Sequence, residues 1–272
     1  MKNFQNPRSV AVRGRRFFVA AEHFPEWWEM VEGGKWEPNL FYLLEKFIVP
    51  NTTVLDVGAW IGGTALFCAH LAEKVYLFEP DVVALNILRG NLSLNPPLGS
   101  KMTLIEAGLG VADDFVPFYN NSLGNSGSSQ LSFEYGKDGV GQKAAGHIRL
   151  IDARRFLSGL DMSKVSLIKM DIEGAEYDLI PYIAPLLEEY RPTLLLSLHP
   201  LKLGGKGSIT EDRFYRFARS VAVFESLAHY PYIFHEENGK LGRRKDKEKV
   251  IHELKTTDIV SGSFAFSYSP GW

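Results

Sequence analysis

Four apolar segments of the sequence end in side chains that bind ligands or transfer protons. Asp56 and Glu79 lie at the ends of the first two segments, and Asp171 and His199 close two later ones. A carboxylate in this position can accept hydrogen bonds from ribose hydroxyls, and an imidazole is a general base near neutral pH. Glu173 follows Asp171 closely. The later pair therefore offers either a base or the ligands of a divalent cation.

A glycine-containing loop follows the first of these segments. The sequence VLDVGAWIGG at residues 54–63 runs from apolar residues through Gly58 and Gly62 into a helix-like stretch. The loop lacks the lysine of a P-loop and the second glycine of the dinucleotide-binding pattern G-x-G-x-x-G. S-adenosylmethionine has no phosphates to cradle and needs acidic groups near its ammonium and ribose. The loop, together with Glu79, therefore favours S-adenosylmethionine, with the glycines close to its methionine and ribose parts.

Strands and helices must alternate to bring these side chains to one edge of a sheet. The expected strands are residues 53–57, 74–79, 102–107, 147–151, 165–170 and 193–198, with two more in YPYIFHE and GSFAFSYS; the expected helices are residues 37–48, 63–73, 81–94, 174–189 and 211–222. Most of these strands are nearly continuous apolar runs, which are typical of a parallel sheet covered by helices on both faces. We therefore expect a doubly wound α/β fold with its ligand at the carboxyl ends of the strands.

Five stretches of the sequence resemble the FkbM family of class I S-adenosylmethionine-dependent methyltransferases. They are WEP (36–38), VLDVGAWIGG (54–63), VYLFEPD (75–81), EAGLG (106–110) and LIKMDIEGAEYDLI (167–180). The resemblance implies a Rossmann-like fold with a mostly parallel seven-stranded sheet, whose last two strands form an antiparallel hairpin. It also implies O-methylation of a hydroxyl group on a small molecule, commonly a sugar or a natural product.

The strand ends and the resemblance together give an expected cofactor site and an expected catalytic site. The expected cofactor-binding residues are Glu37, Asp56, Gly58, Ala59, Trp60, Gly62, Glu79, Pro80, Ala107 and Asp171, and the expected catalytic residues are His199, Asp171 and Glu173. The resemblance implies that Glu37 meets the amino group of the cofactor. The family usually has asparagine in place of Trp60, and often an acidic residue before the histidine where this chain reads Ser197-Leu198-His199-Pro200.

Several of these residues have a structural alternative. Trp60 either covers the cofactor or packs in the core, and Glu176 is expected to favour the N-terminus of a helix rather than to act in the reaction. His199, neutral near pH 7, is expected to take the acceptor's proton directly. A divalent cation held by Asp171 with Glu173 or His199 is the less favoured alternative, because one carboxylate and one imidazole make a sparse magnesium site.

The composition limits the partners of the protein. The 272 residues carry a formal net charge of −2 and a single cysteine, Cys68, so we expect neither a nucleic-acid substrate nor an intramolecular disulfide. No apolar run approaches the roughly 18 residues of a membrane helix, and the N-terminus has no apolar core of a signal peptide. We expect a cytoplasmic enzyme with no membrane partner; the sequence leaves its oligomeric state open.

The sequence predicts one domain with an N-terminal extension. Residues 8–20 are expected to form a β-hairpin within an extension, residues 1–35, that belongs to the same domain as the methyltransferase domain, residues 36–272. The Gly/Ser-rich residues 122–129 are expected to form a mobile loop beside the acceptor pocket. Two rival functions stay open: an NAD-dependent oxidoreductase, disfavoured by the missing glycine, and a non-catalytic binding protein on the same fold.

Overall fold

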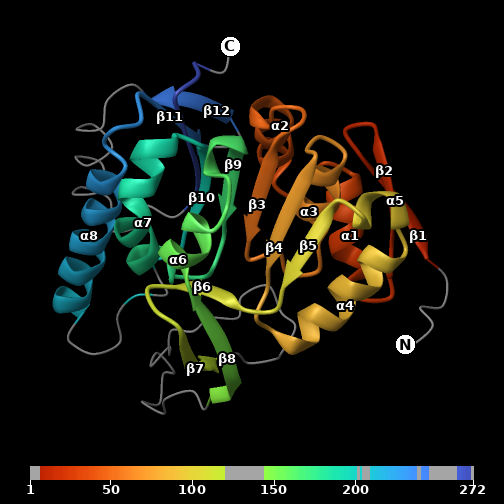
Figure 1. The fold of residues 1–272 in the computed structure, drawn as a ribbon, viewed down its shortest axis with the longest axis horizontal. Helices are drawn as coiled ribbons and strands as arrows, with labels where there is room; N and C mark the ends of the chain where they lie inside the picture. The colour runs from red at the N-terminus through yellow and green to blue at the C-terminus, as the bar shows by residue number, and fades with distance from the viewer. Residues whose placement is uncertain are drawn as a thin grey trace.

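A mixed β-sheet forms the centre of the molecule (Figure 1). The computed structural model describes residues 7–119, 144–200, 203, 209–237, 240–244 and 262–270. Within these residues the sheet has eight strands in the order β5 (Met102–Ile105), β4 (Lys74–Phe78), β3 (Thr53–Val57), β9 (Val165–Met170), β10 (Thr193–Leu198), β13 (Gly262–Ser267), β11 (Tyr232–Glu237) and β12 (Lys240–Arg244). The first five strands are parallel, and β13 lies antiparallel between β10 and β11. This order confirms the expected doubly wound α/β fold.

The sheet has one strand more than the seven expected. The additional strand is β12, which pairs antiparallel with β11 at the edge of the sheet. Its sequence, KLGRR, has no apolar alternation. An edge strand is held by backbone hydrogen bonds on one side only and commonly carries charged residues, so the usual strand pattern is missing here.

Helices cover both faces of the sheet, as Figure 1 shows. The helices of one face are α6 (Ala153–Ser158), α7 (Glu176–Tyr190) and α8 (Ile209–Ser226), and those of the other are α1 (Pro25–Glu32), α2 (Pro38–Phe47), α3 (Gly63–Ala69), α4 (Val82–Ser93) and the short α5 (Pro96–Gly99). Along β10, Leu194 and Leu196 face the first layer and Leu195 faces the second. Burial on both sides explains why the strands read as continuous apolar runs.

The N-terminal hairpin packs into the second helical layer. It consists of β1 (Arg8–Val12) and β2 (Arg15–Val19), as expected, and its buried side chains join the same apolar cluster as α3. The side chain of Asn95 accepts a hydrogen bond from Phe18 N (2.8 Å) and donates one to Phe18 O (2.7 Å). The hairpin and the second helical layer thus share one apolar core.

A second asparagine connects the hairpin to the glycine loop. Asn91, on α4, is fully buried; its Oδ1 accepts a hydrogen bond from Ala20 N (2.8 Å), and its Nδ2 donates one to Ile61 O (2.8 Å). An asparagine side chain offers the same donor and acceptor as a peptide group. The side chains of Asn91 and Asn95 therefore make backbone hydrogen bonds at the end of β2 of the kind that a neighbouring strand would make.

A second, three-stranded sheet lies beside the carboxyl ends of the central strands. It consists of β6 (Gly108–Gly110), β8 (Ala144–Asp152) and β7 (Asp114–Tyr119), in that order. The chain leaves β5 at Ile105, earlier than the expected end at residue 107, because residues 108–110 pair with β8 instead. The Gly/Ser-rich residues 122–129 lie outside the described residues.

One buried ion pair joins four parts of the fold. Lys169 Nζ on β9 lies 3.2 Å from Asp56 Oδ1 on β3 and donates a hydrogen bond to Gly58 O (2.8 Å). The other oxygen of Asp56 accepts a hydrogen bond from Thr64 Oγ1 on α3 (2.6 Å). Burial alone lowers the pKa of Lys169, but the charges of Asp56 and Asp171 outweigh it and raise the pKa above its ordinary value.

We predict that Lys169→Met strongly destabilises the protein. The substitution keeps an unbranched side chain but leaves Asp56 as an uncompensated buried charge, which costs about 3–5 kcal/mol of unfolding free energy. Urea unfolding followed by circular dichroism measures this loss. Lys164→Met is the matched control, because Lys164 pairs with Asp161 at the surface, where its side chain is 69% exposed. Equal losses in the two variants would contradict a structural role for the buried pair.

Candidate active site

A cavity opens at the carboxyl ends of β3, β4 and β9, where the fold places a ligand. It encloses about 940 Å³, including the open solvent at its mouth. The described residues that line it are Trp27, Trp36, Val57, Gly58, Ala59, Trp60, Gly63, Thr64, Phe78, Glu79, Pro80, Asp81, Gly108, Leu109, Phe118, Ile148, Leu150, Lys169, Asp171, Ile172, Glu173 and Ala175. Seven of the expected site residues are among them: Gly58, Ala59, Trp60, Glu79, Pro80, Asp171 and Glu173.

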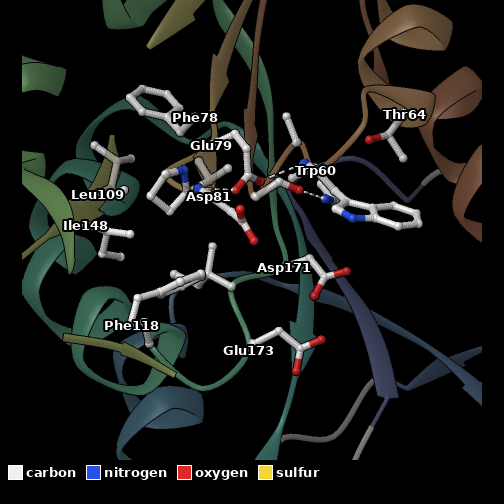
Figure 2. A pocket seen from close by; sticks show the side chains of 18 of the residues that line it. Trp60, Thr64, Phe78, Glu79, Asp81, Leu109, Phe118, Ile148, Asp171 and Glu173 are labelled. Atoms are coloured by element: carbon white, nitrogen blue, oxygen red, sulfur yellow. Dashed lines mark hydrogen bonds between the residues drawn. The ribbon is translucent and has the colours of Figure 1, made fainter. Parts of the chain in front are cut away.

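Glu79 is a buried carboxylate at the end of β4. Its Oε2 accepts a hydrogen bond from Trp60 N (2.8 Å) and its Oε1 accepts one from Asp81 N (2.8 Å), as Figure 2 shows beside the cavity. Burial raises the pKa of Glu79 to about 7, although the two backbone N–H groups favour the charged form. The two hydrogen bonds thus fix the position of the carboxylate, and near pH 7 its neutral and charged forms are both populated.

The packing of the protein itself requires the two glycines of the loop. Gly58 has φ +83°, and a Cβ on it would lie 1.9 Å from the carbonyl oxygen of Asp171. Gly62 has φ +90°, and a Cβ on it would lie 2.5 Å from Leu88 Cδ1. Both positions therefore need glycine for conformation and for close contact within the protein. Gly58 still lines the cavity, whereas Gly62 lies outside its lining.

Three other expected cofactor residues lie away from the cavity lining. Asp56 is fully buried in its ion pair with Lys169 and holds the loop through that lysine. Glu37 begins α2 with φ +38° and lines a second, smaller cavity that also touches Lys169. Ala107 is 1% exposed and packs in the core, and its neighbour Gly108 lines the main cavity instead.

Three tryptophan rings form one wall of the cavity. The ring of Trp27 on α1 lies 5.0 Å from that of Trp36 and 4.9 Å from that of Trp60, measured between centroids. Trp60 has φ +47° and also packs against Phe24. It therefore both lines the cavity and belongs to an aromatic cluster. Trp27 was missed because no element was expected at residues 25–32.

Asp171, Glu173 and His199 converge at the edge of the cavity. His199 Nε2 lies 3.5 Å from Asp171 Oδ1 and 3.8 Å from Glu173 Oε1, and one ligand-type atom from each residue lies within 4.8 Å of the others. Asp171 follows β9, Glu173 occupies the next turn with φ +55°, and His199 follows β10. Because β9 and β10 are adjacent parallel strands, their carboxyl ends bring these residues together.

Glu176 fixes the histidine and the turn at once. Its side chain is fully buried; Oε1 accepts a hydrogen bond from His199 N (2.8 Å) and lies 3.1 Å from His199 Nδ1, while Oε2 accepts one from Gly174 N (2.7 Å). We had expected Glu176 only to favour the start of α7. It lies in the first turn of that helix, but its carboxylate binds His199 and the preceding turn.

The pKa of His199 differs from that of the expected neutral base. Burial lowers its pKa, but the hydrogen bond to Glu176 and the charges of Asp171, Glu176 and Glu173 outweigh burial and raise the pKa to about 9. The imidazole is therefore protonated near neutral pH when only these side chains surround it. In that state it cannot accept a proton from a hydroxyl group.

A search with family models identifies the domain. Residues 56–230, well over half of the chain, match the methyltransferase FkbM domain. The chain belongs to the FkbM methyltransferase family. The family resemblance of the sequence is thereby confirmed, and an NAD-dependent oxidoreductase is left without support. Among the described helices of this FkbM family member, none is long and apolar enough to cross a membrane.

Comparisons with individual proteins give short or distant matches to the FkbM family member. The ribosomal protein L11 methyltransferase of Carboxydothermus hydrogenoformans is 42% identical over 64 residues, 23% of this chain and 21% of that protein. The enzyme of the same description from Limosilactobacillus reuteri is 46% identical over 54 residues, 20% of this chain and 17% of that protein. The matches thus span about a fifth of these curated relatives. The crystal structure of methyltransferase FkbM from Methylobacillus flagellatus has a TM-score of 0.44 and 17% identity, covering 88% of this chain and 52% of that one.

We predict that the charge on Glu79 makes the ligand-free protein less stable as the pH rises. Its folded pKa of about 7 exceeds the ordinary 4.5, so its stabilising contribution is present at low pH and is lost as the pH rises through 7. Relative to Glu79→Gln, the unfolding free energy of the natural protein should fall by about 2–3 kcal/mol between pH 5 and pH 8.

Urea unfolding at both pH values measures this difference. Glu188→Gln is the control, because Glu188 is an exposed glutamate on α7, and its difference from the natural protein should stay nearly constant. If the Glu79→Gln difference were equally constant, Glu79 would have an ordinary pKa in the folded protein.

Proposed function

We propose that this FkbM family member transfers the methyl group of S-adenosylmethionine to a hydroxyl oxygen of a small molecule. One observation carries the proposal. Glu79, at the expected ribose position, lines the same cavity as Asp171 and Glu173, and His199 lies directly behind those two carboxylates. A cofactor held at Glu79 would therefore reach a set of groups that can orient a hydroxyl and take its proton.

The described lining fits the cofactor. Each oxygen of Glu79 already accepts one backbone N–H, and each keeps a lone pair for a ribose hydroxyl. Figure 2 shows the apolar side chains of Phe78, Leu109 and Ile148 on one side of Glu79 and Trp60 on the other. The apolar side suits adenine, and the tryptophan wall with Asp171 suits the positively charged methionine part.

The remaining task of the protein is alignment and removal of a proton. When bound, S-adenosylmethionine supplies a methyl group that its positive sulfur already activates. Holding an oxygen in line behind that methyl group can supply roughly 7–11 kcal/mol in favourable cases. The carboxylates of Asp171 and Glu173 would orient the acceptor hydroxyl and, with no cation bound between them, accept its proton, since His199 is protonated near neutral pH without other ligands.

The charges of the cavity favour a small acceptor without phosphate groups. Glu79, Asp81, Asp171 and Glu173 are acidic, and Lys169 is the one basic side chain among the described lining residues. That lysine is already engaged with Asp56 and the glycine loop. With a formal net charge of −2, the chain also lacks the overall positive charge that attracts a nucleic acid.

We predict that the purified protein binds S-adenosylmethionine and its demethylated product, and does not bind NAD. Calorimetry with the three ligands measures this. Incubation with methyl-labelled S-adenosylmethionine and a panel of glycosides and hydroxylated metabolites should then give O-methylated products, located by mass spectrometry and NMR. Labelling only of RNA or of a ribosomal protein would overturn the small-molecule acceptor. Cofactor binding without transfer to any acceptor class would favour the non-catalytic alternative.

We predict that Glu79→Ala weakens binding of S-adenosylhomocysteine by about 10-fold to 150-fold. The substitution removes hydrogen bonds between a charged acceptor and the ribose hydroxyls, which are worth roughly 1.5–3 kcal/mol. Affinity of the natural protein should also fall as the pH falls below 7, because Glu79 then takes up a proton. The control is Glu106→Ala, which removes an exposed carboxylate paired with Arg89 just after β5. An unchanged dissociation constant in Glu79→Ala would remove Glu79 from the site.

A further inference from the structure

The convergence of Asp171, Glu173 and His199 has the dimensions of a metal site. Ligand atoms about 2.1 Å from one ion lie roughly 3.0–3.4 Å apart when they occupy neighbouring positions. The observed distances from His199 Nε2, 3.5 Å to Asp171 Oδ1 and 3.8 Å to Glu173 Oε1, exceed that range only slightly. Small rotations of the two carboxylates would bring all three atoms around one cation.

Hydrogen bonds to neighbouring residues hold Asp171, His199 and the turn of Glu173 in place. Asp171 N donates a hydrogen bond to Val57 O (3.0 Å), which anchors the residue to the end of β3. Glu176 is fully buried and holds both His199 Nδ1 and the backbone of the turn that carries Glu173. Histidines that bind a metal through one nitrogen commonly donate the other N–H to a carboxylate, which fixes the ring and makes it a better ligand. Here that arrangement directs Nε2 toward the two carboxylates.

We propose that Asp171, Glu173 and His199 bind one divalent transition-metal cation of the Mn²⁺ type through Oδ1, Oε1 and Nε2, and that the proton on Nε2 is released to solvent as the cation binds. The three ligands come from two adjacent strand ends, and Asp171 and Glu173 also line the cavity. An imidazole ligand shifts preference from Mg²⁺ and Ca²⁺, which prefer oxygen, toward Mn²⁺, Fe²⁺ or Zn²⁺. The second carboxylate makes the site less sparse than the one carboxylate and one imidazole expected from the sequence.

The catalytic role of the cation rests on the proposed function. Three protein ligands leave positions open toward the cavity, and two neighbouring oxygens of an acceptor can fill them. The preferred acceptor would then be a vicinal diol or an α-hydroxy acid. Binding to the cation lowers the pKa of the acceptor hydroxyl. Its proton passes to water, the oxygen–methyl bond forms, and the sulfur–methyl bond breaks to leave neutral S-adenosylhomocysteine.

The test measures metal binding by the full chain without any acceptor. The protein is treated with a chelator, dialysed and titrated with Mn²⁺, and the free ion is followed by electron paramagnetic resonance. We expect one bound Mn²⁺ per chain, weak competition by Mg²⁺, and loss of affinity by more than 100-fold in Asp171→Asn and His199→Ala. Glu176→Gln, which keeps the three ligands, should weaken binding about 10-fold to 100-fold.

Asp178→Asn is the matched control, because Asp178 also lies on α7 and pairs with Arg219 away from the cavity; its Mn²⁺ affinity should equal that of the natural protein. Asp171→Asn is nearly isosteric, and circular dichroism checks its fold together with that of His199→Ala. Absence of bound Mn²⁺, or equal binding by the natural protein and Asp171→Asn, would overturn the proposal.

Activity separates this proposal from the proposed function. Full methyl transfer in the presence of chelator would overturn the metal site while supporting the methyltransferase. Specific Mn²⁺ binding without binding of S-adenosylhomocysteine would leave the metal site standing and overturn the proposed function. Preference for vicinal diols over isolated hydroxyl groups, seen only with Mn²⁺ present, would support both.

Discussion

The ion pair between Asp56 and Lys169 connects the strands, the glycine loop and the first helix after it. A lysine inside a parallel sheet is costly unless a charge and a hydrogen-bond acceptor meet it. Here Asp56 supplies the charge and Gly58 O the acceptor, so the start of the loop must lie near β9. The same closeness puts Gly58 against the carbonyl of Asp171. The loop and the strand end that carries Asp171 are therefore positioned by one set of contacts.

Two further buried carboxylates, Glu79 and Glu176, hold loop segments beside the cavity. Glu79 receives backbone N–H groups from the glycine loop and from the start of α4, and Glu176 receives them from the turn after β9 and from His199. Each carboxylate thus joins segments that are distant in sequence, and each uses backbone donors that belong to loops. Loops held in this way stay in place before any ligand binds, which reduces the entropy that binding must overcome.

The sequence predicted the strands better than the site. Strands β3, β9 and β10 match the expected residues because apolar runs on both faces have clear limits, whereas β12 lacked that pattern. Glu79, Asp171 and Glu173 line the cavity because strand ends fix their positions. The roles of Asp56 and Glu176 were harder to predict, since their partners, Lys169 and His199, become their neighbours only in the folded protein. Helix α1 was missed because it is short and has no side-chain cap, and its Trp27 went unnoticed with it.

The hydrogen bonds of Asn91 and Asn95 also determine when the N-terminal hairpin can become stable during synthesis. The hydrogen bonds from Ala20 and Phe18 to Asn91 and Asn95 span 71 and 77 positions along the chain. A two-stranded hairpin alone is marginally stable in water at best. Because β1 and β2 precede Asn91 and Asn95 in the chain, they cannot form these hydrogen bonds until both asparagines have been synthesised. The hairpin thus becomes stable only after the segments that follow it have been made, and until then its apolar face lacks its native partners.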